Sequence, residues 1–407
     1  MRKKKAQDRE VTYYFQFRNR RKGKTKVWLS KLPTNHAQTA TLLQRNRDPL
    51  SVNNTGGNTI EYYELESGEK LKLRYRVKIH SSPSSHQTVS LTSEERERYL
   101  RSTSFITINQ EIKDVALNIC KGLNTDREKA YAIFQYVYRQ FSYRVRVKKR
   151  GSIHFLKTKK GDCGEFSALY AALCRSIGIP CRMLFGTFAV DVFQPHAWNE
   201  VFLEDKGWIP VDASMANVQR KQIWRFFFSN IRTLKPSHYF GNTEGQRVIF
   251  SVDTEHPCIP RYPDTVSHHS GKMREFTMVF GEERLVWGKE LLKDKKIPYY
   301  QPMYLYSSSE RFAPKGEDYL GNWKVVERGK SRLFLILKKT AAWLTIFFMV
   351  WSMITESTLF SVLYAVSVPF YGWMSALRGE RTLVFSSIAL FFLAIDLFVL
   401  FVYLNVN

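Results

Sequence analysis

Alternation of hydrophobic and polar positions dominates the first part of the chain and predicts an all-β domain over residues 1–85. Four segments are rich in Val, Tyr and Thr, and the last has an apolar residue at every second position, as in a strand with one buried face. They are Val11–Phe17, Thr25–Leu29, Thr59–Leu65 and Glu69–Ile79. Asn53–Gly57 has the composition of a turn. Because the strands must bury their apolar faces on one another, we expect a small β-sandwich.

From about residue 90 the hydrophobic period lengthens to that of amphipathic helices. The expected helices begin at Ser93, follow a cap at Asn109, begin at Asp126 and cover Glu165–Ile177. Two apolar strand-like stretches joined by a turn come next, so the segment mixes helices with strands. We therefore expect an α+β domain over residues 90–260. Residues 261–330 form a mixed basic region in which no motif predicts a structure.

The last part of the chain, residues 331–407, is strongly apolar and predicts a helical transmembrane module of two or three helices. Leu383–Val406 carries a single charged residue and exceeds the roughly 20 residues that cross a bilayer. Ala341–Leu377 would be about 55 Å long as one helix, too long for a hydrocarbon core of about 30 Å. We therefore expect two passes or a re-entrant hairpin that turns at Glu356–Thr358. The alternative is a set of buried helices in a soluble protein.

Charge narrows the classes of partner. Lys and Arg number 62 against 37 Asp and Glu, so the formal net charge is +25. A basic domain tethered beside a bilayer is expected to lie against its anionic surface. The basic run Arg144–Lys160 could lower the pKa of a nearby cysteine, attract an acidic substrate, contact anionic lipid or be a solvated loop. No helix-turn-helix, RNP-like or zinc-finger pattern occurs, so we expect no nucleic-acid partner.

Basic residues near the apolar segments predict their orientation. Lys338 and Lys339 precede the first pass, and Arg378 and Arg381 lie between the second and the third. Both pairs fall on one side of the membrane if the first two passes form a hairpin, and positive charge marks the cytoplasmic side. We therefore expect the soluble domains in the cytoplasm. Asp396 lies within the last apolar segment, where a charge is costly unless it faces a partner such as another helix or a second subunit. The equal alternative is a protonated Asp396 that bonds a serine or a backbone group.

The cysteine usage points to reactivity rather than to scaffolding. Five cysteines in 407 residues, none in a C-x-x-C pair, exclude a disulfide scaffold and predict no structural zinc site, and we expect neither metal nor cofactor. Cys163 begins a predicted helix, where the free N–H groups and the helix dipole favour the thiolate that a nucleophile needs. The alternative is a small buried residue, the reading we give to Cys120, Cys174 and Cys181.

A predicted β-hairpin supplies a histidine and a carboxylate. Pro195–Leu203 and Trp208–Asp212 have strand composition and are joined by a turn at Glu204–Gly207. The hairpin brings His196 and Asp212 into one neighbourhood, at the roughly 7–8 Å of diagonal cross-strand pairs. Asp212 would then orient the imidazole, and His196 would take up the thiol proton. The alternative is a core histidine and a turn aspartate.

Two further residues of the same strand are candidates for contact with a substrate. Trp198 and Glu200 share the face of His196, because side chains two apart on a strand point the same way. We expect them to shield or brace the site, and core packing is an equal alternative for Trp198.

Four motifs in chain order resemble the transglutaminase-like superfamily. They are Gly161–Ser167, Ile177–Arg182, His196–Val201 and Trp208–Ala213. The resemblance covers about residues 110–213 and implies a papain-like fold with a Cys-His-Asp triad. It assigns Cys163 as nucleophile, His196 as base and Asp212 as orienting carboxylate. Phe240–Asn242 and Arg247–Phe250 look like the C-terminal strands of that fold, and the β region before it is similar to the sandwich that often precedes this core in prokaryotic members.

The resemblance implies a thiol enzyme, a cysteine peptidase or a transamidase, acting on amide bonds of a protein or peptide substrate through a thioester on the cysteine. It does not choose between water and an amine as the acceptor. It also leaves a catalytically silent alternative, in which the same fold binds a peptide or serves as a membrane-tethered scaffold. The expected protein is a membrane-anchored member of prokaryotic type.

Overall fold

The computed structural model describes residues 9–80, 90–145, 150–191, 194–222, 225, 229–261, 277–280, 283–286, 296–307, 322–380 and 382–406. The chain divides into two compact units. The first contains Met1–Gln222 and Leu234–Val325, and the second contains Ile223–Thr233 and Val326–Asn407.

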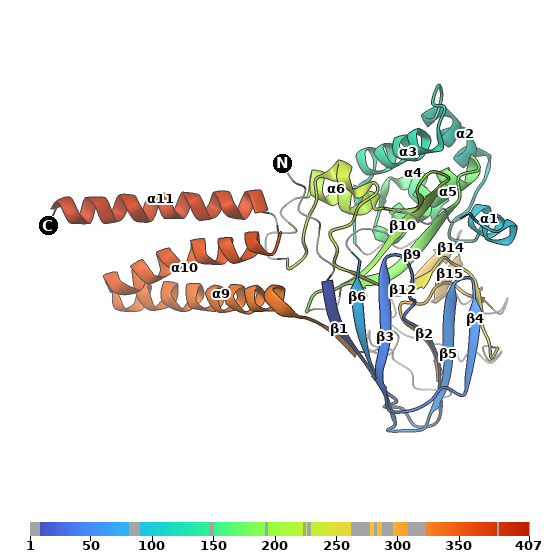
Figure 1. Ribbon diagram of the computed structural model, residues 1–407, viewed down its shortest axis with the longest axis horizontal. Coiled ribbons are helices and arrows are strands. Elements are labelled where there is room, and N and C mark those ends of the chain that lie inside the picture. The colour runs from blue at the N-terminus through green and yellow to red at the C-terminus, as the bar shows by residue number, and fades with distance from the viewer. Residues whose placement is uncertain are drawn as a thin grey trace. The chain divides into compact units, whose positions relative to one another are not determined.

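The N-terminal strands form two four-stranded antiparallel sheets, in the orders β18-β1-β6-β3 and β17-β2-β5-β4 (Figure 1). The bounds are β1 Arg9–Arg18, β2 Thr25–Lys31, β3 Gln38–Arg45, β4 Ser51–Thr55, β5 Asn58–Leu65, β6 Lys70–Ile79, β17 Met303–Ser307 and β18 Asn322–Glu327. The alternating residues of β6 are buried, as the sequence predicts. They join the apolar residues of β1 and β2 in one core. The expected antiparallel β region is confirmed, and β17 and β18, from far along the chain, complete its two sheets.

The turn predicted at Asn53–Gly57 is narrower than expected. Thr55 pairs with Asn58, so only Gly56 and Gly57 form the loop, and Asn53 and Asn54 belong to β4. Both glycines have positive φ, 55° and 81°, the backbone of a two-residue hairpin that glycine adopts without steric cost.

The α+β domain is built around one helix and one sheet. Helix α5, Cys163–Ser176, packs against β9 and β10 and is surrounded by the helices α2, α3, α4 and α6 (Figure 1). The sheet has the order β11-β10-β9-β12. Its strands are β9 Cys181–Phe188, β10 Pro195–Leu203, β11 Gly207–Val211 and β12 Arg247–Val252. The other helices are α1 Ser93–Leu100, α2 Gln110–Ile119, α3 Asp126–Gln140, α4 Ser152–Thr158, α6 Ala213–Lys221 and the 3₁₀ turn η2 Pro236–Tyr239.

Helix starts in this domain follow the capping residues of the sequence. Asn109 accepts from the N–H of Ile112 as predicted. Helix α3 begins at Asp126, also as predicted, and Thr125 caps it in a reciprocal capping box with Glu128. The predicted apolar face of α3 is buried. Short pairs complete the unit: β7 Ser142–Tyr143 with β8 Lys160–Gly161, β13 His256–Pro257 with β16 Lys296–Ile297, and β14 Thr277–Phe280 with β15 Glu283–Val286. The α+β fold class is confirmed.

The second unit contains three long C-terminal helices, of which α10 packs against both others (Figure 1). They are α9 Gly329–Thr355, α10 Thr358–Leu377 and α11 Thr382–Val406. The first turn falls where the sequence predicts it, since Glu356 ends α9 in the left-handed conformation with φ 50°. By length and apolar composition, α9 and α10 could each cross a membrane. The predicted third segment is also one helix.

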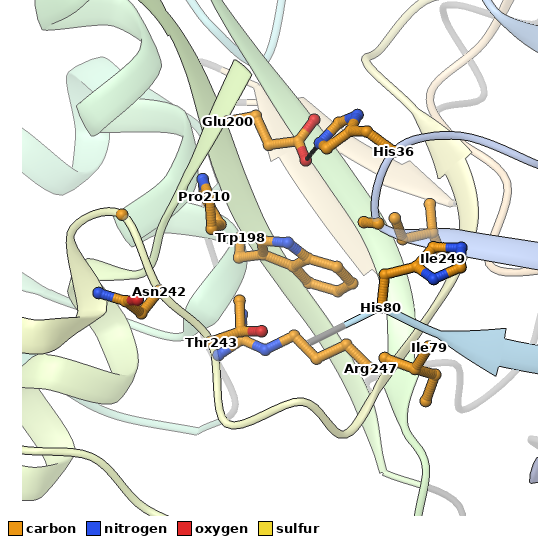
Figure 2. A pocket seen from close by; sticks show the side chains of 12 residues that line it. His36, Ile79, His80, Trp198, Glu200, Pro210, Asn242, Thr243, Arg247 and Ile249 are labelled. Carbon is orange, nitrogen blue, oxygen red and sulfur yellow. Dashed lines mark hydrogen bonds and ion pairs between the residues drawn. The ribbon is translucent and has the colours of Figure 1, made fainter. Parts of the chain in front are cut away.

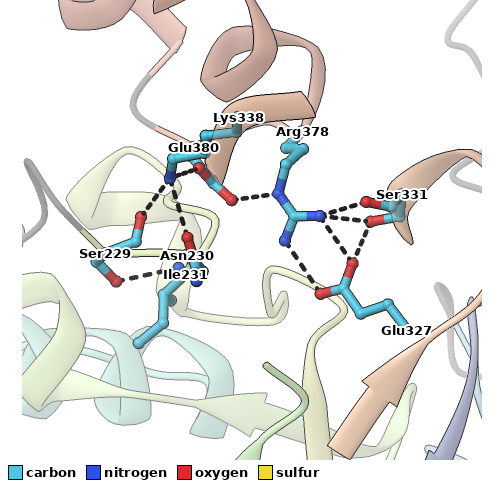
Figure 3. Close-up of polar contacts among 8 residues, drawn as sticks. All are labelled: Ser229, Asn230, Ile231, Glu327, Ser331, Lys338, Arg378 and Glu380. Carbon is cyan, nitrogen blue, oxygen red and sulfur yellow. Dashed lines mark hydrogen bonds and ion pairs between the residues drawn. The ribbon is translucent and has the colours of Figure 1, made fainter. Parts of the chain in front are cut away.

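A chain of buried charges lies at the end of this unit where α9 begins and α10 ends (Figure 3). Lys338 pairs with Glu380 at 2.5 Å, Glu380 pairs with Arg378 at 2.5 Å, and both Nη atoms of Arg378 contact Glu327 at 2.9 and 3.1 Å. All four side chains are at most 4% exposed. Lys338 also donates to Asn230 at 3.0 Å. Two of the basic residues used above to predict orientation are therefore neutralised by carboxylates.

Candidate active site

Cys163 is the first residue of α5. Asp162 caps the helix by accepting from the N–H of Gly164 at 2.9 Å, and Glu165 returns a bond to the N–H of Asp162. Across the helix, the amide of Asn199 donates to the carbonyl of Ser167 at 3.0 Å and fixes α5 to β10. Cys163 is half-buried, whereas Cys120, Cys174, Cys181 and Cys258 are buried. The structure thus leaves this one thiol of the five within reach of solvent.

The protonation of this thiol differs from the sequence expectation. Burial raises the pKa of Cys163 well above its ordinary value, and the charge of Asp162 raises it further. The backbone N–H of Ala197 and the charge of Arg150 act in the opposite direction but do not outweigh these effects. The position at a helix N-terminus, which by itself favours the thiolate, is therefore not sufficient, and the resting thiol is neutral.

One residue of the basic run is part of the site. Arg150 Nη1 lies 2.6 Å from Asp162 and 2.8 Å from Glu165. Burial raises the pKa of Glu165 to about 8, whereas the Arg150 charge holds the pKa of Asp162 below its ordinary value in spite of burial. Arg150 and an ionised Asp162 thus pair beside Cys163. Among the roles considered for the basic run Arg144–Lys160, lowering the pKa of the nearby cysteine applies to Arg150. Residues 146–149 of that run lie outside the described residues.

The structure brings His196 and Asp212 into direct contact. His196 Nε2 is 2.7 Å from Asp212 Oδ2, and both side chains are at most 6% exposed. The register pairs Asn199 with Val211, so Asp212 follows the end of β11 and caps α6 instead of lying on the strand. Its Oδ1 accepts from Ser214 Oγ at 2.7 Å and from the N–H of Met215 at 2.8 Å. The carboxylate is therefore fixed by a helix on one oxygen and holds the imidazole with the other.

Cys163 lies next to this pair. The backbone N–H of Ala197, the residue after His196, faces the sulfur closely enough to favour its ionised form, and the charge of Asp212 also acts on the thiol. With Nε2 of His196 committed to Asp212, Nδ1 is the ring nitrogen left for the sulfur. The three residues singled out in the sequence thus form one neighbourhood.

Arg247 is a member of the site that sequence reasoning missed. Its Nη1 is 2.8 Å from Asp212 Oδ2, and its Nε and Nη2 form a two-point contact with Glu244 at 2.7 and 2.9 Å. Burial would raise the pKa of Asp212, but the charges of His196 and Arg247 and the bonds to the carboxylate hold it well below its usual range. Asp212 is therefore an anion at every physiological pH.

Trp198 and Glu200, both drawn in Figure 2, make contacts within the protein. The Trp198 ring stacks on His196 at 5.9 Å between centroids and lies under the Arg247 guanidinium at 5.0 Å. Glu200 is 2.8 Å from His36 and makes a two-point contact with Arg182 at 2.9 and 2.7 Å. Both side chains are buried. Bracing of the histidine, one of the two expectations, fits this geometry, and contact of Trp198 or Glu200 with a substrate stays a prediction.

Figure 2 also shows a small cleft on this side of the sheet. It is lined by His36, Ala37, Ile79, His80, Trp198, Glu200, Pro210, Gly241, Asn242, Thr243, Arg247 and Ile249. Among the described residues, no group of three or more His, Cys, Asp or Glu side chains could hold a metal ion.

Comparisons with known proteins agree with the fold. The family model described as "Transglutaminase-like superfamily" matches residues 113–213. Kyphoscoliosis peptidase from Homo sapiens is 25% identical over 146 residues, which are 32% of this chain and 22% of the human protein. The mouse protein of the same name is 26% identical over 133 residues, or 29% of this chain and 20% of the relative. The chain thus aligns with about a fifth of the length of these relatives.

Solved structures give weaker likenesses. A candidate cysteine protease from Cytophaga hutchinsonii aligns with 79% of this chain and 99% of its own, at 12% identity and a TM-score of 0.43. A structure of a TGase aligns with 43% of this chain and 44% of its own, at 18% identity and a TM-score of 0.19. The family match covers the helix that begins at Cys163, the strand of His196 and the cap at Asp212. Residues 113–213 of this chain thus match a transglutaminase-like domain.

Proposed function

We propose that the protein is a membrane-anchored thiol enzyme that cleaves or transfers acyl groups at amide bonds of proteins or peptides, with Cys163 as nucleophile, His196 as general base and Asp212 as orienting carboxylate. The observation that carries the proposal is the contact of 2.7 Å between His196 and Asp212. Ala197, the residue after His196, directs its backbone N–H at the Cys163 sulfur. A peptidase or transamidase is the chemistry this arrangement supports.

The raised pKa of Cys163 determines how the first step runs. Because the resting thiol is neutral, it must lose its proton as it attacks. We assign His196 Nδ1 as the proton acceptor, since Nε2 is bound to Asp212. Sγ adds to the amide carbonyl carbon, and the resulting oxyanion needs a donor. The backbone N–H of Cys163, free of an intrahelical partner at the first position of α5, is a generic candidate.

Collapse of this intermediate breaks the C–N bond. His196 returns its proton to the leaving amine, and a thioester remains on Cys163. Water or a second amine then attacks the thioester, assisted again by His196, and releases an acid or a new amide. Asp212 keeps the Nε2 proton of the imidazole in place throughout and stabilises the imidazolium, aided by the charge of Arg247, which keeps the carboxylate ionised.

The test compares Cys163→Ala with Cys120→Ala, a buried cysteine at the end of α2. Full-length protein in detergent is incubated with a peptide library with and without a primary amine, and products are identified by mass. We expect turnover in wild type and Cys120→Ala and none in Cys163→Ala. Amine-containing products would assign a transamidase, and shortened or deamidated peptides a hydrolase. Equal turnover in Cys163→Ala would refute the proposal, and no turnover or acyl-probe labelling in wild type would leave the scaffold alternative.

We propose a bilayer as the surroundings of the C-terminal helices. Helices α9 and α10 have 27 and 20 residues, at or above the length that crosses a hydrocarbon core. Large apolar side chains along them are exposed, Trp343 by 73% and Met353 by 76%. A water-exposed surface of this kind is unfavourable, whereas lipid makes it favourable. Flotation of the full chain with vesicles, compared with a variant lacking residues 329–407, tests the anchor.

We also propose that the catalytic domain faces the cytoplasm and an anionic leaflet. Lys330, Arg332 and Lys339 are exposed near the start of α9. Positive charge beside a membrane span favours the cytoplasmic side, which supports this proposal. Labelling of a cysteine introduced at an exposed position, such as Glu204→Cys in a Cys163→Ala background, from each side of sealed vesicles tests the sidedness. Labelling from outside intact cells would refute it.

A further inference from the structure

A short segment from the region without sequence motifs, Ile297–Pro302, lies on the elements that carry the candidate catalytic residues. We call it the 297–302 segment. Its backbone is fixed by three neighbours: the N–H of Glu255 bonds Pro298 O at 2.9 Å, Ser251 Oγ bonds Tyr300 O at 2.5 Å, and the N–H of Ser30 bonds Pro302 O at 2.9 Å. A segment held at three carbonyls has a defined position, so the side chains it carries have defined positions too.

Gln301 connects this segment to the histidine. Its Nε2 donates to the carbonyl of Gly186 at 2.8 Å and to the carbonyl of His196 at 3.1 Å. Gly186 and His196 are direct partners in the β9–β10 register. The side-chain amide of Gln301 therefore bridges β9 and β10 at the level of His196. The ring of His196 is the one that lies 2.7 Å from Asp212. The bridge restrains the backbone from which the imidazole projects.

Tyr299 lies on the cysteine side of the same pair of strands. Its ring stacks on Phe185, with 4.2 Å between centroids and 2° between planes. Phe185 is the register partner of Ala197, whose N–H faces the Cys163 sulfur, and paired residues direct their side chains to the same face. Burial raises the pKa of the Tyr299 phenol, and Asp162 and Cys163 contribute in the same direction. The stacking on Phe185 and the electrostatic interaction with Cys163 both place Tyr299 near the nucleophile.

We propose that the 297–302 segment forms a wall of the catalytic cleft, in which Gln301 is a positioning residue for His196 and Tyr299 selects substrates with an apolar residue next to the scissile amide. One face of the Tyr299 ring is covered by Phe185, and the half-buried side chain keeps some exposed surface on the cysteine side of these strands. An aromatic or aliphatic side chain of a peptide gains contact there that glycine does not. The inference rests on the proposed thiol-enzyme function.

The test of Gln301 uses Gln301→Leu and Gln301→Glu, since the second keeps the shape and removes the donor. The control is Tyr300→Phe on the same segment, because the Tyr300 hydroxyl has no hydrogen-bond partner within the described part of the chain. We expect both Gln301 variants to lower kcat about tenfold at unchanged KM, since loss of alignment between base and nucleophile affects the chemical step. We also expect the midpoint of the pH profile for Cys163 alkylation by iodoacetamide, followed by mass spectrometry, to shift.

The test of Tyr299 uses Tyr299→Ala with paired peptides that carry leucine or glycine beside the scissile amide. Wild type is expected to prefer leucine in kcat/KM, and Tyr299→Ala to lose about tenfold of that preference, the effect of a few apolar groups in a pocket. An unchanged preference would overturn the role of Tyr299. Melting temperatures within 2 °C or so of Tyr300→Phe would show that the kinetic changes do not come from unfolding.

The outcomes distinguish the proposed thiol-enzyme function from the positioning role of Gln301. Turnover in Cys163→Ala equal to wild type defeats the proposed function itself. Turnover that depends on Cys163 but is the same in Gln301→Leu, Gln301→Glu and Tyr300→Phe defeats only the positioning role. Should wild type turn over none of the peptides, the alkylation profile still decides, since an unshifted midpoint in both Gln301 variants overturns it.

Discussion

Removal of Arg247 should cost far more than the loss of one surface charge, because two buried carboxylates depend on it. Arg247 and Glu244 are at most 4% exposed, and the guanidinium contacts Asp212 as well. In Arg247→Met, Asp212 keeps His196 and the N-terminus of α6, whereas Glu244 loses both of its bonds to the guanidinium. Breaking a buried pair from one side costs about 3–5 kcal/mol.

The double variant Arg247→Met/Glu244→Gln distinguishes this reason from loss of packing. Glutamine removes the unpaired charge and keeps the shape of Glu244, so it should recover most of the cost attributable to that charge. We expect the double variant to be more stable than Arg247→Met by about 2 kcal/mol, although Glu244→Gln alone is destabilising. A stability change of Glu244→Gln that has opposite signs with and without Arg247 directly measures the coupling between these two residues.

The assay is thermal unfolding of the full chain in detergent. At about 2 °C per kcal/mol for a unit of this size, Arg247→Met should melt roughly 6–10 °C below wild type, and the double variant should regain about 4 °C. Arg247 also stacks over Trp198, so part of the loss will remain. If Glu244→Gln lowers the melting temperature equally with and without Arg247, the buried-charge reasoning is refuted.

Three further substitutions follow from the structure. Asp212→Asn should lower kcat by roughly 10²–10⁴-fold, because the imidazole loses its anionic partner. The stability that the ionised Asp212 contributes is present above about pH 4 and declines as the pH falls. The melting temperatures of variant and wild type should therefore converge in acid. Glu165, whose pKa is raised to about 8, keeps its proton in the folded state while an unfolded glutamate loses it above about pH 4.3; wild-type stability should therefore fall as pH rises from 5 to 8, and Glu165→Gln should show a flatter melting profile over that range. Lys338→Met should lower the resistance of the helical unit to proteolysis, because it leaves Glu380 without this buried partner. Lys339→Met, at the exposed neighbouring position, should not. Equal effects would contradict the role assigned to the Lys338–Glu380 pair.

The residues expected to form the site could be found in the sequence because each stands at a local landmark. Cys163 follows a helix cap, and His196 and Asp212 flank a hairpin whose turn is readable in the chain. Local patterns also predict the positions of α2, α3 and the break at Glu356. What these signals could not give is the atom-level arrangement, such as Asp212 serving as a helix cap while it holds the imidazole.

The missed elements depend on partners far along the chain. Strands β3 and β4 lie at the sheet edges, and their polar, partly exposed residues give no alternating pattern. They are strands because β6 and β5 supply hydrogen-bonding partners. Arg247 reaches Asp212 because β12 pairs with β9. Gln301 lies just before β17 and bonds the carbonyls of Gly186 and His196. No local pattern in residues 215–330 carries that information.

The buried ion pairs of Lys338 and Arg378 leave other basic residues to set the predicted membrane orientation, and that orientation stays the same. Lys338 and Arg378 cannot act as free positive charges at the membrane surface, since Glu380 and Glu327 neutralise them within the protein. Counting basic residues along the sequence therefore overstates the positive charge there. The residues that remain exposed near the start of α9, Lys330, Arg332 and Lys339, still precede the apolar part of the helix. Because orientation follows the charge available to lipid and not the formal count, substitution of these three should change the topology, whereas replacing the paired Lys338 should alter stability alone.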